Sequence, residues 1–178
     1  LGPKSLFGHC IHLSERERDA LSETGSIAVH CPTSNLFLGS GLFPLKELMR
    51  RERPVRVSVA TDVGGGTSYS MLKTMDEAYK IQQLLGERLN PFDSYYHMTL
   101  GNAEALSLAD RIGTLDAGTD ADFIVLNMAA TPAMAVKAEV VNSLAEELFL
   151  LQTMGDDRAV VETYVAGIAS KSSLSTWR

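Results

Sequence analysis

Three short apolar segments, each followed by a helical pattern, fill the first 85 residues, and this order restricts the possible fold more than any other feature. Ser14 and Glu17 have the spacing of a capping box, which indicates that a helix begins there. Parallel strands need long crossover connections, which are usually helices. The alternation therefore predicts an α/β fold with a parallel sheet. We expect strands at 4–11, 26–31 and 55–59 and helices at 14–22, 42–51 and 68–85.

The composition changes near Asp110, where Gly and Asp become frequent and turns are expected. Asn90-Pro91 is a helix-start signal, and one helix is expected over 92–106. We therefore predict two units, residues 1–110 and residues 111–178. In the second unit we expect strands at 121–126 and 160–168 and a helix near 143–153, and we expect loops at 32–35 and in the Ala-, Thr- and Met-rich stretch before 143.

Charge and cysteine content exclude several classes of protein. The chain has 16 Lys and Arg against 22 Asp and Glu, a net charge of −6, and lacks the clustered basic excess of proteins that bind nucleic acid. Cys10 and Cys31 cannot build a disulfide framework and suit a reducing compartment. No apolar run approaches the roughly 20 residues that span a bilayer, and no leader pattern opens the chain. We expect a cytoplasmic protein without nucleic-acid or membrane partners; because residue 1 is Leu, we also expect a longer parent chain.

Titratable side chains stand at the carboxyl ends of all three early strands: His9, His30 and Asp62. This edge of a parallel sheet is where α/β proteins bind ligands. Asp62 precedes three glycines, Gly64 to Gly66, which let the backbone approach a ligand closely. A carboxylate there can ligate a metal or accept a proton from metal-bound water. An Asx-turn or helix-cap role is equally open, whereas a phosphate-binding loop is disfavoured because the segment lacks the P-loop lysine.

The histidines have structural alternatives as well. His9 and Cys10 are neighbours on a strand and would point to opposite faces, so a zinc finger is disfavoured, and a hydrogen-bonded core histidine remains the alternative for His9. His30 precedes a segment whose Pro, Ser and Asn residues can supply hydrogen bonds around a pocket. We therefore take His30 and Asn35 as candidate substrate-pocket residues. Neither cysteine has an evident base partner, and no nucleophilic thiol is proposed.

Four segments carry a resemblance to a known family: Gly8-His9-Cys10, Val29 to Asn35, Thr61 to Leu72 and Ile112 to Phe123. Together they resemble the amidohydrolase superfamily and, within it, the guanine deaminases. The resemblance implies the C-terminal portion of a (β/α)₈ TIM-barrel metal-dependent hydrolase plus a small β-sandwich-like domain. Residues 1–110 would form the last three βα units and the following helix, and 111–178 the C-terminal part of the small composite β-domain.

This resemblance implies zinc-dependent hydrolytic deamination of guanine to xanthine and ammonia, a step of purine catabolism. Asp62 would ligate the single zinc ion and shuttle the proton of the attacking water. His9 would hydrogen-bond the hydroxide or the substrate, and His30 and Asn35 would lie near the pocket. The partner would be a small-molecule purine, and the full-length enzyme would be a homodimer.

The chain departs from the family pattern in its metal ligands. A His-x-His motif, a further histidine and a glutamate are all expected before Leu1, and no His-x-His occurs in the sequence. Zinc sites use three or more protein ligands, so we predict that the 178 residues alone neither hold zinc tightly nor deaminate guanine. Two alternatives remain: a related deaminase or chlorohydrolase acting on another nitrogen heterocycle, and a noncatalytic half-barrel that binds a partner or a complementary fragment.

Overall fold

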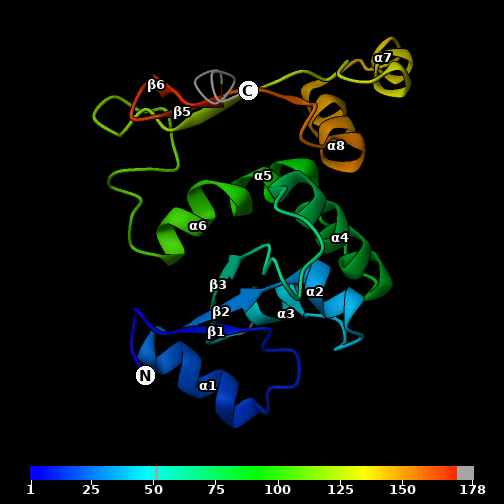
Figure 1. The fold of residues 1–178 in the computed structure, drawn as a ribbon. Helices are drawn as coiled ribbons and strands as arrows, with labels where there is room; N and C mark the ends of the chain where they lie inside the picture. The colour runs from blue at the N-terminus through cyan, green and yellow to red at the C-terminus, as the bar shows by residue number, and fades with distance from the viewer. Residues whose placement is uncertain (51, 172–178) are drawn as a thin grey trace.

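The structure is a computed structural model that describes residues 1–50 and 52–171 (Figure 1). Residue 51, at the end of one predicted helix, and residues 172–178 of the second predicted unit lie outside the described residues. The elements are β1 (Leu6–Gly8), α1 (Glu15–Thr24), β2 (Ile27–His30), α2 (Pro32–Phe37), α3 (Leu45–Arg50), β3 (Arg56–Val59), α4 (Met71–Leu84), α5 (Pro91–Met98), α6 (Leu100–Ala105), β4 (Phe123–Leu126), α7 (Pro132–Ala138), α8 (Leu144–Met154), β5 (Val160–Val165) and β6 (Ile168–Ala169).

The first sheet has the order β1-β2-β3, and both neighbouring pairs are parallel. Gly8 pairs with Val29, and His30 pairs with Val59, so the carboxyl ends of the three strands lie at one edge. The central strand β2 is buried along its whole length. The predicted α/β fold with parallel strands and helical crossovers is therefore confirmed.

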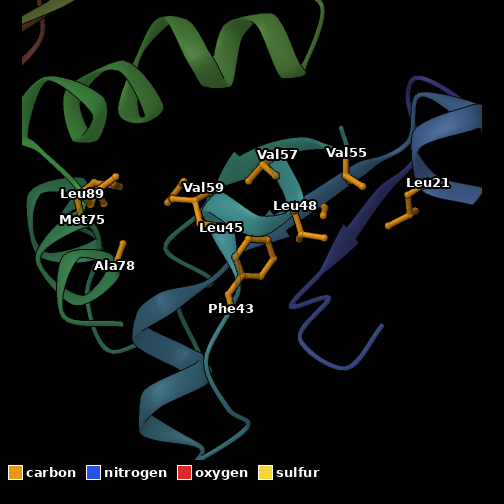
Figure 2. Close-up of a cluster of buried hydrophobic side chains, with 11 residues drawn as sticks. Leu21, Phe43, Leu45, Leu48, Val55, Val57, Val59, Met75, Ala78 and Leu89 are labelled. Atoms are coloured by element: carbon orange, nitrogen blue, oxygen red, sulfur yellow. The ribbon is translucent and has the colours of Figure 1, made fainter. Parts of the chain in front are cut away.

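One face of this sheet carries the main hydrophobic core (Figure 2). Helices α1, α3 and α4 contribute Leu21, Leu48 and Met75 to it, and β3 contributes Val57. Full burial of a large aliphatic or aromatic side chain stabilises a fold by about 1.5–3 kcal/mol. The opposite face is covered more thinly: Ile27, Val29 and Cys31 pack there with Ala105 of α6. The helices therefore hold the strands mainly from one side.

The second sheet is antiparallel, with the order β4-β5-β6, and its strands are half-buried or exposed. It lies beyond α6 in Figure 1, and a cavity of about 630 Å³ between α6 and β4 is lined by Asn102, Ala103 and Ile124 among others. The expected single strand at 160–168 is wrong. Ala166 and Gly167 have φ angles of 49° and 77°, and this turn divides the segment into the hairpin β5–β6.

Three further expectations need correction. The segment 32–35 is not a loop, because Pro32 occupies the first turn of α2, where its missing N–H costs nothing. The Ala-, Thr- and Met-rich stretch contains α7, which Thr131 caps through the Met134 N–H. The helix expected over 92–106 is two helices, since Thr99 has the non-helical angles φ −123° and ψ −102°. The division at residue 110 falls between α6 and β4 and remains a prediction.

None of the described helices combines the length and the apolar character that a membrane crossing requires.

Candidate active site

His9 and Asp62, which lie 53 positions apart in the sequence, meet at the carboxyl edge of the parallel sheet. His9 directly follows β1 and Asp62 follows β3 by three positions. The distance from His9 Nε2 to Asp62 Oδ2 is 3.8 Å, and the two side chains are 48% and 39% exposed. A base and a carboxylate that face each other within reach of solvent can bind a cation or a polar ligand together.

The backbone at this edge is unusual. His9, Cys10 and Asp62 have φ angles of 73°, 46° and 48°, in the left-handed region that residues other than glycine seldom adopt. Such conformations cost of order 1–3 kcal/mol each and tend to occur at functional sites. Both His9 and Asp62 are thus held in conformations that the surrounding fold imposes on them.

Gly66 closes the loop after β3 against the sheet. Its N–H donates to the Asp62 carbonyl at 2.5 Å. A Cβ atom at residue 66 would lie 2.0 Å from the Thr61 carbonyl oxygen and 2.7 Å from Thr33 Oγ1. Only glycine fits this approach, and the tight loop places the Asp62 carboxylate.

The helix after this loop, α4, is capped by Ser70, whose hydroxyl accepts from the Lys73 N–H. The helix-cap alternative for Asp62 is therefore wrong. Its carboxylate is instead directed to the site, where it faces His9.

The Asn35 side chain is hydrogen-bonded to the ring of His9. Its Oδ1 lies 2.8 Å from His9 Nδ1, within hydrogen-bond distance, and its side chain is fully buried on α2. The structure thus brings together three of the four predicted site residues: His9, Asn35 and Asp62.

His30, the fourth predicted site residue, has a different environment. Its ring is fully buried and stacks on Phe43 with centroids 4.5 Å apart, on the side of the main core. Burial is the largest cause that lowers the His30 pKa, to about 3, and the positive field of His97 adds to it. Neither ring nitrogen has a hydrogen-bond partner among the described residues. His30 is therefore buried in the main core, whereas the His9 side chain is partly exposed at the carboxyl edge of the sheet.

Cys31, which is not among the four predicted site residues, also lies beside His9 and Asp62. One ligand atom each from His9, Cys31 and Asp62 lies within 4.8 Å of the other two. Burial is the largest cause that raises the pKa of the Cys31 thiol. The alternation of side chains along a strand could have indicated this difference between Cys31 and His30. Ile27 and Val29 share a face of the sheet with Cys31, opposite the face of His30.

These side chains match the chemistry of a metal centre. Imidazole nitrogen, carboxylate oxygen and thiolate sulfur are the donors that zinc takes in proteins. His9 also lines an open cleft of about 670 Å³ together with Phe7, Ile11 and Leu13. A cation could thus be held beside a partly apolar space.

A candidate metal centre at the carboxyl ends of parallel strands defines a class of α/β protein that binds its ligand where the βα loops converge. The model of the Amidohydrolase family matches residues 1–169. The chain belongs to this family.

Comparisons with individual proteins agree with the family. The guanine deaminase of Escherichia coli strain K12 is 47% identical over 166 residues, which are 93% of this chain and 37% of that enzyme. The solved structure of E. coli guanine deaminase matches with a TM-score of 0.91 and 46% identity, over 95% of this chain and 39% of that one. The chain therefore spans well under half the length of these relatives.

Two further structures extend the comparison. Guanine deaminase from C. acetobutylicum, solved with guanine in its active site, has 27% identity and a TM-score of 0.78, over 92% of this chain and 38% of that one. An adenosine deaminase from Xanthomonas campestris with bound zinc shares the fold at 24% identity and a TM-score of 0.77, over 94% of this chain and 37% of that one.

Proposed function

We propose that this chain supplies part of the active site of a zinc-dependent guanine deaminase, which converts guanine and water to xanthine and ammonia. The observation that carries the proposal is the convergence of His9 and Asp62 at one sheet edge, 3.8 Å apart. The 47% identity to a guanine deaminase supports guanine as the substrate. The chain covers 37% of that relative, so the activity is proposed for a protein that contains this chain.

The proposal includes the architecture. The three βα units of the first sheet would belong to a (β/α)₈ barrel, and β4–β6 to a small β-sandwich-like domain. A complete barrel takes about 250 residues, more than the 178 of this chain. The half-exposed strands of the second sheet are consistent with a domain that is completed by other residues.

Asp62 is the residue that we propose as the zinc ligand of this chain, and His9 and Cys31 lie beside it. Zinc, when bound, supplies a Lewis acid that makes water acidic enough to yield hydroxide near neutral pH. The donor chemistry at this edge fits the ion.

The chain's own residues would guide the protons. The Asp62 carboxylate would accept one proton of the attacking water as the water oxygen bonds to the ring carbon that carries the amino group and the π bond of that carbon opens onto the ring nitrogen. The same carboxyl group would return the proton to the amino nitrogen. The π bond then re-forms as the carbon–amino bond breaks, ammonia leaves, and the second water proton moves from oxygen to the ring nitrogen to give xanthine. His9 holds the water in line through a hydrogen bond. The position of His9 beside the Asp62 carboxylate supports this division of roles.

We further propose a small-molecule purine as ligand, a homodimer as the assembly of the full-length enzyme and the cytoplasm as its location. The net charge of −6 supports a ligand other than a nucleic acid or an anionic membrane. His30 is proposed as support for the pocket from the core side, since its ring stacks on Phe43.

Substrate profiling of the protein that contains this chain tests the activity. We expect guanine to be preferred over adenosine and over chlorinated triazines, and ammonia to be released in proportion to xanthine. A clear preference for triazines or adenosine would move the function to another deaminase or chlorohydrolase of the family. Release of no product from any of them would favour a noncatalytic role.

Elemental analysis of the 178-residue chain by itself tests the ligand count. We expect less than stoichiometric zinc, because the proposal assigns it one zinc ligand, Asp62. Stoichiometric zinc would show that His9 and Cys31 complete a site without other residues.

A further inference from the structure

Among the described residues, the Asn35 side chain has one hydrogen-bond partner, the ring of His9, and this contact joins two different βα units. Asn35 lies on α2, which follows β2, whereas His9 follows β1. Oδ1 of Asn35 is 2.8 Å from Nδ1 of His9. The contact thus fixes the ring from a neighbouring unit of the fold.

Asn35 is a rigid support. It is fully buried, its backbone N–H donates to the Cys31 carbonyl at 3.0 Å, and its carbonyl accepts from the Ser40 N–H at 2.9 Å. The His9 side chain, in contrast, is 48% exposed. The buried amide therefore sets the orientation of the exposed ring, and not the reverse.

An amide oxygen only accepts hydrogen bonds, so a neutral ring bonded to it must carry its proton on Nδ1. Nε2 then keeps a lone pair and faces Asp62 Oδ2 at 3.8 Å. The opposite amide orientation would place a proton on Nε2. That N–H would face a carboxylate and would be expected to bond to it at about 2.7–2.9 Å, whereas the distance is 3.8 Å.

Two acceptors that face each other at this distance share no proton. They leave space for something that both can bind, such as a water hydrogen or a cation. The amide orientation of Asn35 therefore decides whether His9 Nε2 is an acceptor beside the Asp62 carboxylate or carries a proton that faces it.

We infer that Asn35 is a positioning residue, which fixes His9 in the Nδ1-protonated form so that Nε2 accepts a hydrogen bond or a cation beside Asp62. This inference deepens the proposed function by giving His9 a defined state. Outer-shell partners of this kind, when removed, typically cost 10- to 100-fold in activity or affinity.

The wild-type protein tests the inference directly. Histidine-selective ¹⁵N labelling, recorded at a pH where the ring is neutral, shows which nitrogen carries the proton, and His9→Gln identifies the His9 signals. We expect the proton on Nδ1. A proton on Nε2 would overturn the inference, whatever the protein catalyses.

Variants separate positioning from folding. Asn35→Leu removes the acceptor at similar size, and we expect the His9 proton to move toward Nε2 and kcat to fall about 10- to 100-fold with little change in KM. Asn35→Asp keeps an acceptor and should keep the proton on Nδ1. Asn142→Asp makes the same chemical change at an exposed residue and should leave both readouts unchanged.

A His9 tautomer that is the same in Asn35→Leu and wild type would also overturn the inference. If Asn35→Leu does not fold, the wild-type and Asn35→Asp spectra still decide it. Absence of guanine deaminase activity with the proton on Nδ1 would contradict the proposed function alone.

Discussion

Two histidines follow the same rule of sequence position, yet the ends of β1 and β2 give them opposite environments. His9, after β1, is 48% exposed on its side chain, bonded to Asn35 and directed to Asp62. His30, at the end of β2, is fully buried against Phe43, and its ring nitrogens have no partner among the described residues. Position at a strand end therefore identifies candidate site residues. Solvent access then distinguishes those that can meet a ligand from those that belong to the core.

The difference follows from what each residue packs against. His30 lies at the end of the buried strand β2 and stacks on Phe43 of the main core, whereas His9 follows β1, whose three described residues are exposed. A histidine that packs inside the core is kept neutral by burial. A histidine that stays within reach of solvent can meet a ligand.

The largest effect is expected from Asp62→Asn at the exposed edge. Asparagine tolerates the left-handed backbone that residue 62 adopts, with φ 48° in the native chain, so the fold should be kept. Loss of the proton acceptor should lower kcat for guanine by about 10²- to 10⁴-fold. Steady-state kinetics and urea unfolding of the protein that contains this chain measure both quantities. Activity within tenfold of wild type would remove Asp62 from the proposed mechanism.

Gly66→Ala should destabilise the contact between the loop after β3 and α2, because its methyl group would overlap Thr61 and Thr33. We expect a loss of about 3 kcal/mol in the free energy of unfolding, at the upper end of overpacking costs. Gly8→Ala is the control, since no heavy atom lies within 4 Å of its added Cβ. Equal stability of the two variants in chemical denaturation would contradict the tight loop.

His30→Leu should change how stability depends on pH. Burial lowers the His30 pKa in the folded state to about 3 from 6.5, so between these values the unfolded chain binds a proton that the folded chain does not. Stability should therefore fall as the pH drops below 6.5, by up to about 1.4 kcal/mol per pH unit from this group.

The variant removes that contribution, so its unfolding free energy should decline less steeply between pH 6.5 and pH 4. Urea unfolding at several pH values, with wild type and His12→Gln in parallel, measures the slopes. Identical slopes for wild type and His30→Leu would show that His30 titrates normally and that the two strand ends differ less than their burial indicates.

The smallest effect is expected far from both strand ends. Arg53 pairs with Glu23 at 2.8 Å and with Asp19 at 3.9 Å, and all three side chains are exposed to solvent. Exposed ion pairs contribute about 0–1 kcal/mol. Arg53→Gln should thus lower the free energy of unfolding by less than about 1 kcal/mol, as thermal unfolding with added salt can verify. A loss in the free energy of unfolding as large as that of Gly66→Ala would contradict the weak contribution expected of these exposed ion pairs.

Local signals predicted much of the fold. Ser14 and Glu17 form the capping box that the sequence indicates, with both reciprocal contacts present. The strand expected at 55–59 is present as β3, and Val55, Val57 and Val59 all pack into the main core. Prediction failed at 32–35, where Pro32 opens a helix, and at 160–168, where one apolar run holds a turn. A proline is compatible with a turn or with the first turn of a helix, and a short apolar run with one strand or with a hairpin. Tertiary packing determines which of the two structures forms.

The sequence by itself determined the α/β order, the strand-end residues His9, His30 and Asp62, and the family to which the chain belongs. Only the tertiary structure decided which of these residues meet. His30 is buried because its ring packs on Phe43 of the main core, whereas His9 and Asp62, both in left-handed backbone conformations, face each other at the exposed edge. Core packing and backbone strain depend on contacts between distant segments, so no local pattern specifies them.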